Sequence, residues 1–243
     1  MSGPEGPHCI WSTVADRTRI IRFVVKPVVF LAGLGPAVYL TWAALTGHLS
    51  ANPLSDVTNE TGVWTLRFVA ITLTMTPLRR LTGWNDVIKF RRMMGLYAFF
   101  YGMLHFTTYV VLDRFAGLVE FPGGIVSWTT VRSLLKSIGG DIYQRPFITI
   151  GFTALVLMVP LAITSTAGMI RRLGGRRWNQ LHRLVYVTAI CGVIHYWWLV
   201  KADIRRPQTY AAIMAILLGY RVVRVFQESR RRLAVRTAAP VKP

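Results

Sequence analysis

Six long apolar runs, separated by short and mostly basic connections, constrain this chain more than any other feature. A helix needs about 20 apolar residues to cross the ~30 Å hydrocarbon core of a bilayer, and most of these runs approach or reach that length. The runs predict an all-α integral membrane protein, a bundle of six transmembrane helices. The expected spans are residues 27–45, 61–78, 93–112, 147–170, 181–200 and 207–220.

The composition agrees with this interpretation. Hydrophobic residues make up 53% of the 243 residues and charged residues only 16%, and the mean hydropathy is +0.41. Disordered chains are poor in apolar residues, and so few charged groups could not cover this much apolar surface in water. These values exclude a disordered protein and argue against a soluble enzyme. The two cysteines form neither a CxxC zinc motif nor a CxxCH motif for covalent haem.

The distribution of basic residues predicts the orientation. The net charge is +19, and the segments that would share a side with both termini carry 21 Lys and Arg residues against 7 on the other side. Because cytoplasmic connections are enriched in Lys and Arg, we expect both termini in the cytoplasm and attribute the excess charge to topology rather than to nucleic-acid binding. We expect a disordered N-terminal tail over residues 1–20, one transmembrane domain over 21–226 and a basic cytoplasmic tail over 227–243.

The connection formed by residues 113–146 is the largest one expected on the outer side of the membrane. Within it, residues 125–138 combine Trp128 and leucines with Arg132 and Lys136, a mixture that suits a short helix lying at the membrane surface. A merely connecting loop is the alternative. This connection is the best candidate for a surface on which a partner protein docks on that side.

Three of the five histidines fall within or at the edge of expected spans. Ionisable side chains are costly inside a bilayer and commonly mark a functional site. At 1.5 Å per helical residue, His105 lies ~18 Å and His195 ~21 Å from the side on which their spans begin, so the two imidazoles reach a similar depth. This arrangement predicts that His105 and His195 are the two axial ligands of one b-type haem.

Small residues near both histidines favour the haem interpretation. Gly102 and Gly192 each precede a histidine by three residues and would let a flat macrocycle approach the helix backbones. The alternative is a pair of buried histidines that form hydrogen bonds to residues such as Thr108 or Tyr196.

His182 lies ~20 Å from His195 along the same span, near the expected cytoplasmic surface. The third span has no histidine at the matching depth. This place could hold a second haem with Met93 or Met94 as the other ligand, or an anionic group such as a flavin phosphate bound by arginines. The alternative is that these arginines only set the topology and contact lipid headgroups. They are Arg91, Arg92, Arg176 and Arg177.

Three segments carry a family resemblance: RRMMGLYAFFYGMLHFTTYVVLD at residues 91–113, PLAITSTAGMIRRLGGRRWNQLHRLVY at 160–186, and HYWWLVKAD at 195–203. They resemble the haem-binding membrane subunit of the bacterial periplasmic methionine sulfoxide reductase system, part of the ferric reductase-like transmembrane superfamily. The resemblance covers roughly residues 20–225, and its most specific part is the second segment.

The resemblance implies a six-helix, iron-containing haem protein of the bacterial inner membrane. Such a subunit takes electrons from the quinone pool or a cytoplasmic flavin reductase and passes them to a periplasmic molybdopterin-containing reductase that repairs oxidised methionines. It is an electron-transfer subunit rather than the catalytic subunit. The haem-ligand histidines of the family match His105, His182 and His195, which leaves one haem b or two. FMN is also associated with the family, but no motif assigns its residues.

Two other functions fit the same residues. One is a quinol-linked cytochrome b or ferric reductase that serves another acceptor. The other is a non-redox transporter with intramembrane histidines on a proton path, which would purify without colour.

Overall fold

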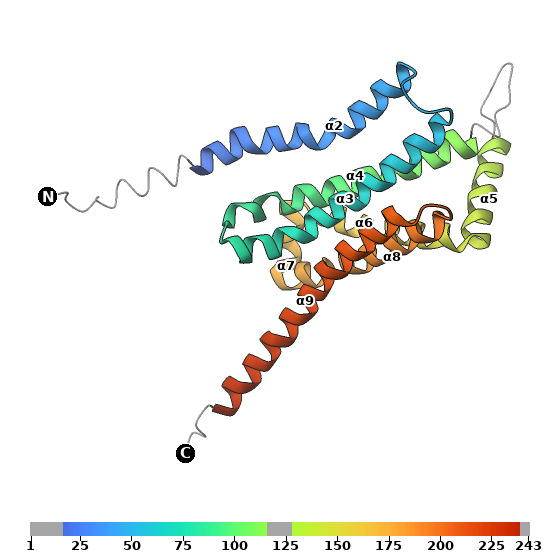
Figure 1. The fold of residues 1–243 in the computed structure, drawn as a ribbon. Helices are drawn as coiled ribbons and strands as arrows, with labels where there is room; N and C mark the ends of the chain where they lie inside the picture. The colour runs from blue at the N-terminus through green and yellow to red at the C-terminus, as the bar shows by residue number, and fades with distance from the viewer. Residues whose placement is uncertain (1–16, 116–127, 239–243) are drawn as a thin grey trace. The chain divides into compact units, whose positions relative to one another are not determined.

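The computed structural model describes residues 17–115 and 128–238, and every regular element within these ranges is helical (Figure 1). The chain forms two units, residues 1–53 and 54–243, which are described separately. The first unit contains the π-helical turn η1 (Ile21–Val25) and helix α2 (Lys26–Leu45). The second contains α3 (Pro53–Thr82), η2 (Asn85–Phe90), α4 (Arg91–Thr108), η3 (Tyr109–Phe115), α5 (Trp128–Gln144), α6 (Pro146–Ile163), α7 (Ala167–Leu181), α8 (Leu184–Leu199) and α9 (Arg205–Ala238).

The helical segments at both ends extend beyond the expected domain. A continuous helix begins at Arg17, so residues 17–20, which we expected in a disordered tail, are helical. At the other end, α9 continues past residue 226 to Ala238. Both extensions lack glycine and proline, the residues that most strongly destabilise a helix interior. Residues 1–16 and 239–243 of the expected tails lie outside the described residues.

Several helices have the length and composition of membrane spans. Helix α8 is shorter, with 16 residues, but also apolar, and the 30-residue α3 contains Arg67 among many polar residues. The chain is therefore a multi-pass membrane protein, whereas the count of six spans and their orientation stay predictions. Four segments of the described chain are long and apolar enough to cross a membrane: Arg17–Leu45, Asn85–Leu112, Pro146–Ile163 and Arg205–Arg232.

The fourth expected span, residues 147–170, is wrong at its C-terminal end. Helix α6 ends at Ile163, and α7 follows after a short break. Thr166 accounts for the break, because its backbone is extended (φ −81°, ψ 150°) and its side chain accepts a hydrogen bond from the N–H of Met169 as the N-cap of α7. Helix α7 is itself interrupted at Gly174, whose φ of 73° suits glycine and strains other residues.

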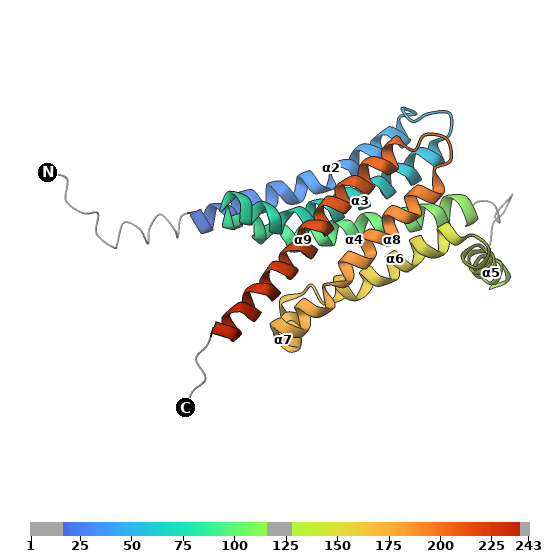
Figure 2. The same cartoon turned by 60° about the horizontal axis from the view of Figure 1, so that its bottom comes forward.

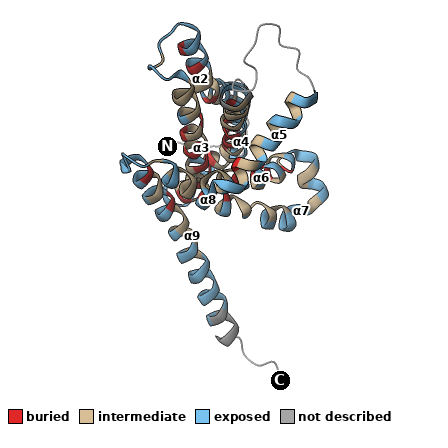
Figure 3. Ribbon diagram, turned by 90° about the vertical axis from the view of Figure 1, so that its right-hand side faces the viewer, coloured by how far each residue is buried: buried red, intermediate tan, exposed pale blue. Residues whose placement is uncertain are grey.

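The core of the second unit lies where α3, α4, α6 and α8 meet, and most buried positions in Figure 3 are on these helices. Helix α6 packs along α8, and α4 contacts α6. The ring of Phe68 on α3 stacks on Tyr97 and Tyr101 of α4, with ring centres 5.1 and 5.3 Å apart. Helices α5 and α7 lie at opposite ends of this bundle (Figures 1 and 2), which we call the α5 end and the α7 end.

Arg221 connects α9 to two other helices. Its Nη1 donates a hydrogen bond to the Tyr186 hydroxyl at 2.9 Å, and its Nη2 donates one to the Leu73 carbonyl at 2.7 Å. Leu73 lies four residues before Pro77 in α3. Because proline has no N–H, this carbonyl lacks its usual helical partner, and Arg221 replaces it.

Helix α5 follows the end of α4 and leads into α6 (Figure 1). A helix was expected over residues 125–138; residues 128–138 are confirmed as helical, and residues 125–127 lie outside the described part. Large apolar side chains on α5 are solvent-exposed, with Trp128 72% and Tyr143 91% accessible. The placement of α5 at the membrane surface stays a prediction.

Candidate functional site

Two of the histidines that we expected to bind haem lie side by side, one on α4 and one on α8. The ring centres of His105 and His195 are 6.1 Å apart, and the ring planes form an angle of 78°. Each Nδ1 donates a hydrogen bond to a backbone carbonyl of another helix: His105 to Thr58 of α3 at 2.8 Å, and His195 to Phe147 of α6 at 2.6 Å. Since a carbonyl oxygen only accepts, Nδ1 carries the proton and Nε2 of the neutral ring offers its lone pair.

A glycine faces each imidazole across the helix interface. A Cβ atom at Gly62 would lie 3.2 Å from the ring of His105, and one at Gly151 would lie 2.6 Å from Nδ1 of His195. Each glycine also follows, by four residues, the carbonyl that accepts the hydrogen bond. Helical side chains lean toward the N-terminus, so a side chain at either glycine would cover that carbonyl. Sequence reasoning missed both residues; the available signal was a glycine within an expected span near the depth of the histidines.

The two glycines that we expected to admit a macrocycle have a different role. A Cβ atom at Gly102 would lie 2.9 Å from Cε of Met158, and one at Gly192 would lie 3.0 Å from Cδ2 of Leu66. One turn away from the histidines, these glycines let α4 pack against α6 and α8 against α3. The expectation for Gly102 and Gly192 is therefore wrong.

The alternative expectation was that the two histidines form hydrogen bonds to side chains such as those of Thr108 or Tyr196, and the observed hydrogen bonds are different. The hydroxyl of Thr108 donates to the carbonyl of Leu104 in its own helix at 2.8 Å. The ring of Tyr196 packs edge-on against Tyr210, with ring centres 6.1 Å apart. Backbone carbonyls hold both imidazoles instead, as carbonyls commonly do for histidines that bind metals.

The separation of the two rings suits one iron bound between them. A metal–imidazole bond is about 2 Å long and the ring nitrogen lies about 1.1 Å from the ring centre, so two imidazoles on opposite sides of one metal have centres about 6 Å apart. The observed 6.1 Å agrees with this value, and rotation about the metal–nitrogen bonds permits the 78° angle. Together with the space that Gly62 and Gly151 provide for the rings, these residues fit a six-coordinate haem iron.

The rest of the described chain contains no competing metal site of the zinc or iron–sulfur type. Within residues 17–115 and 128–238, no three His, Cys, Asp or Glu side chains gather as they would around such an ion. A haem iron needs only two protein ligands, because the porphyrin supplies the other four nitrogens.

His182 lies at the α7 end, in the turn between α7 and α8. The ring of Trp178 stacks on it with a centre-to-centre distance of 3.9 Å. Its Nε2 is 3.2 Å from the hydroxyl of Thr164, and the indole N–H of Trp178 donates to the Thr164 carbonyl at 2.9 Å. Among the described histidines, none lies beside His182 as His105 lies beside His195.

A cavity of about 220 Å³ opens next to His182. This volume is below the roughly 300–1,000 Å³ of pockets that enclose a drug-sized ligand, so it would hold part of a cofactor. Arg91 and Arg92, two of the expected anion-binding residues, line it together with Trp178 and Ser165. Arg177 is exposed and does not line this cavity, and neither Met93 nor Met94 does.

Comparison with known proteins identifies the family. Residues 61–193 match the family described as ferric reductase like transmembrane component. Over 214 residues, 87% of this chain and 90% of the relative, the sequence is 46% identical to the protein-methionine-sulfoxide reductase heme-binding subunit MsrQ of Herminiimonas arsenicoxydans. The same-named protein of Ralstonia nicotianae is 48% identical over 220 residues, 90% of this chain and 94% of the relative. The chain belongs to the MsrQ family.

The MsrQ family confirms the resemblance carried by the three sequence segments. A further MsrQ protein, from Xanthomonas euvesicatoria, is 42% identical over 229 residues, 94% of each chain. No solved structure matches the chain. His105 and His182 fall within the matched residues 61–193, and His195 follows two residues later.

Proposed function

We propose that this chain is the haem b-carrying electron-transfer subunit of a bacterial periplasmic methionine sulfoxide reductase system. It would lie in the inner membrane with six spans and both termini in the cytoplasm. The observation that carries the proposal is the pair of imidazoles of His105 and His195, held by backbone carbonyls with ring centres 6.1 Å apart. The names of the MsrQ relatives, heme-binding subunits of protein-methionine-sulfoxide reductase, support the choice of cofactor and system.

In this proposal the Nε2 atoms of His105 and His195 hold the haem iron. When bound, the haem would supply a one-electron carrier, and His105 and His195 would be the protein groups that hold its iron. The carbonyls of Thr58 and Phe147 keep each ring in one tautomer and one orientation and make the Nε2 atoms better donors.

A second redox group would lie at the α7 end. His182 lines the cavity there, and Arg91 and Arg92 provide guanidinium groups that pair with carboxylate or phosphate oxygens. The group would be a second haem with His182 as a ligand, or FMN held by its phosphate. Arg177, outside the cavity, would contact lipid headgroups or the electron donor.

The two ends of the bundle would then meet different partners. The α7 end would face the cytoplasm and receive electrons from the quinone pool or a flavin reductase. The α5 end would face the periplasmic molybdopterin-containing reductase, with the exposed Trp128 and Tyr143 of α5 as part of the docking surface. Methionine sulfoxide would be reduced on that partner, so this chain is an electron-transfer subunit rather than the catalytic one.

The test is a reduced-minus-oxidised absorption spectrum of the purified protein and of His105→Ala and His195→Ala variants. His48→Ala is the matched control, because His48 is exposed and its ring bonds to the nearby Thr46 hydroxyl. We expect a b-type spectrum in the wild type and control and its loss in both variants. A haem signal that survives in both would refute the ligand assignment, and a colourless wild-type protein would refute electron transfer altogether.

The acceptor needs a separate measurement. Reduced protein, prepared with dithionite and freed of excess reductant, is mixed with the molybdopterin reductase and methionine sulfoxide. Oxidation of the b-type signal only when both are present supports the proposed system. A signal that stays reduced assigns the chain to a different acceptor, as for a quinol-linked cytochrome b or a ferric reductase.

A further inference from the structure

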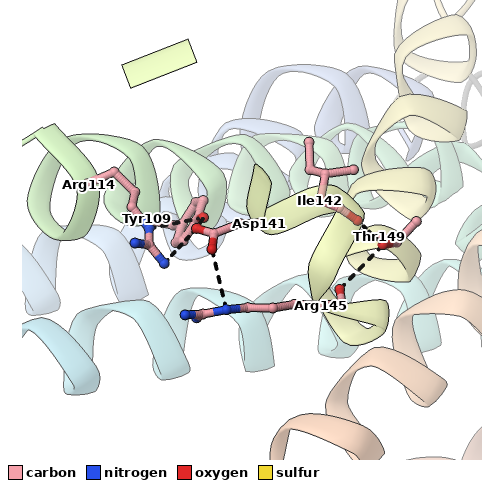
Figure 4. Close-up of polar contacts among 6 residues, drawn as sticks. All are labelled: Tyr109, Arg114, Asp141, Ile142, Arg145 and Thr149. Carbon is pink, nitrogen blue, oxygen red and sulfur yellow. Dashed lines mark hydrogen bonds and ion pairs between the residues drawn. The ribbon is translucent and has the colours of Figure 1, made fainter. Parts of the chain in front are cut away.

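A nearly buried carboxylate at the α5 end joins three other polar side chains into one network (Figure 4). Asp141 of α5 is 9% exposed. Its Oδ2 accepts a hydrogen bond from the Tyr109 hydroxyl at 2.5 Å and lies 2.5 Å from Nη2 of Arg114. Its Oδ1 lies 3.3 Å from Nε of Arg145. One carboxylate thus pairs with two guanidinium groups and accepts a hydrogen bond from one phenol.

One arm of the network ends on the helix that carries His105. Tyr109 follows His105 by four residues, about one helical turn, and begins the π-helical segment η3. In that segment Arg114 lies five residues after Tyr109, and its Nε donates to the Tyr109 hydroxyl at 3.2 Å. Asp141 therefore fixes the helix one turn beyond His105 with two donors.

The other arm ends on the helix that holds His195. Arg145 is the N-cap of α6, its backbone N–H donates to the Asp141 carbonyl at 2.9 Å, and Pro146 follows it. Phe147 lies in the first turn of α6, and its carbonyl accepts the hydrogen bond from His195. The ends of helices fray unless they are anchored. The Asp141–Arg145 ion pair therefore helps to hold this turn, together with the Thr149 hydroxyl, which donates to the Ile142 carbonyl (Figure 4).

We propose that Asp141 is a positioning residue for the imidazole pair, because its carboxylate joins the helix end beyond His105 to the first turn of α6, whose Phe147 carbonyl orients His195. This inference rests on the proposed function, in which the pair holds haem iron. Residues that orient metal ligands affect metal affinity and the properties of the metal although they never touch it.

Removal of the charge at Asp141 has two physical consequences. An amide at this position cannot balance Arg114 and Arg145, so both arms lose their ion pairs and the two rings gain freedom to turn. The loss of one negative charge beside the two guanidinium groups also favours the electron-rich state of a nearby redox centre. Looser ligands predict faster haem loss, and the lost negative charge predicts a more positive midpoint potential.

The experiment compares haem-loaded wild type with Asp141→Asn in detergent. Asp86→Asn is the matched control, because the side chain of Asp86 is similarly covered (15% exposed, against 11% for the side chain of Asp141) and pairs with Lys89 at the opposite end of α4. The readouts are the low-spin ferric EPR signal, the midpoint potential from a redox titration and the rate of haem transfer to apomyoglobin.

We expect Asp141→Asn to change the EPR g values, to shift the potential in the positive direction and to lose haem roughly tenfold faster, with Asp86→Asn like the wild type. Tyr109→Phe, which keeps both ion pairs, should change the g values less. An Asp141→Asn protein that matches Asp86→Asn in all three readouts overturns the inference. If Asp141→Asn does not fold, Tyr109→Phe and Arg145→Gln, which removes the ion pair, decide in its place, and wild-type values in both overturn it.

The two proposals fail in different ways. Retention of haem by His105→Ala and His195→Ala removes the imidazole pair as the ligand set. Loss of haem in those variants, together with a wild-type signal in Asp141→Asn, leaves the function intact and removes only the positioning role. A variant that is merely less stable would give less holoprotein, with unchanged g values and potential in the part that keeps haem.

Discussion

Substitution of Gly151 by alanine tests the site with a single added methyl group. The new Cβ would lie 2.6 Å from Nδ1 and 2.8 Å from Cε1 of His195, whereas ordinary contact begins at 3.4 Å, so the ring must move by about 0.8 Å. The hydrogen bond to the Phe147 carbonyl would then lengthen or break, at a cost of about 1–3 kcal/mol, and the crowding adds a similar amount. A shift of this size exceeds the ~0.5 Å within which ligand geometry must be held.

We expect Gly151→Ala to lower haem affinity about 10–100-fold, as measured by haem content after purification and by haem transfer to apomyoglobin. Gly62→Ala should have a smaller effect, because its Cβ would lie 3.2 Å from the His105 ring. Gly219→Ala in α9 is the control, since nothing lies within 4 Å of its added Cβ. A Gly151→Ala protein that keeps haem as tightly as Gly219→Ala would refute the placement of the His195 ring.

Two further substitutions address other parts of the chain. Arg221→Met removes the hydrogen-bond donor to the Leu73 carbonyl and the Tyr186 hydroxyl, at a cost of about 1–3 kcal/mol for each group. Thermal unfolding in detergent should therefore occur at a lower temperature than for the control Arg231→Met, whose arginine is exposed. Equal midpoints would contradict the anchoring role. His182→Ala should keep the haem between His105 and His195 and lose the second redox group, as measured by haem and FMN per protein; unchanged amounts of both would place that group elsewhere.

The sequence predicted the all-helical fold and the proximity of His105 and His195, because both depend on properties that extend over many residues. Apolar runs and helical rise place His105 and His195 at a similar depth, and the structure brings their rings together. The end of the fourth span was wrong for a local reason. Residues 164–170 are apolar or neutral, so hydropathy alone did not reveal that Thr166 caps a new helix.

Contacts between helices could not be predicted from single positions. Gly102 and Gly192 were chosen because they are near the histidines in sequence, whereas the glycines that face the rings, Gly62 and Gly151, lie on other helices. Asp141 belongs to the connection that we expected on the outer side of the membrane, and the contact between α5 and η3 brings its carboxylate to Tyr109.

The architecture of the pair implies an uneven sensitivity to mutation. Each of the two histidines depends on two helices: its own, and a neighbouring helix that supplies the carbonyl acceptor and the glycine facing the ring. Because the acceptors are backbone atoms, a new side chain at Thr58 or Phe147 leaves the acceptor of the histidine hydrogen bond in place. A new side chain at Gly62 or Gly151, in contrast, would collide with the imidazole that donates this bond. In the proposed haem site, the orientation of the two imidazoles would therefore depend on the packing of four helices, so residues that contact neither ring, such as Asp141, would affect it.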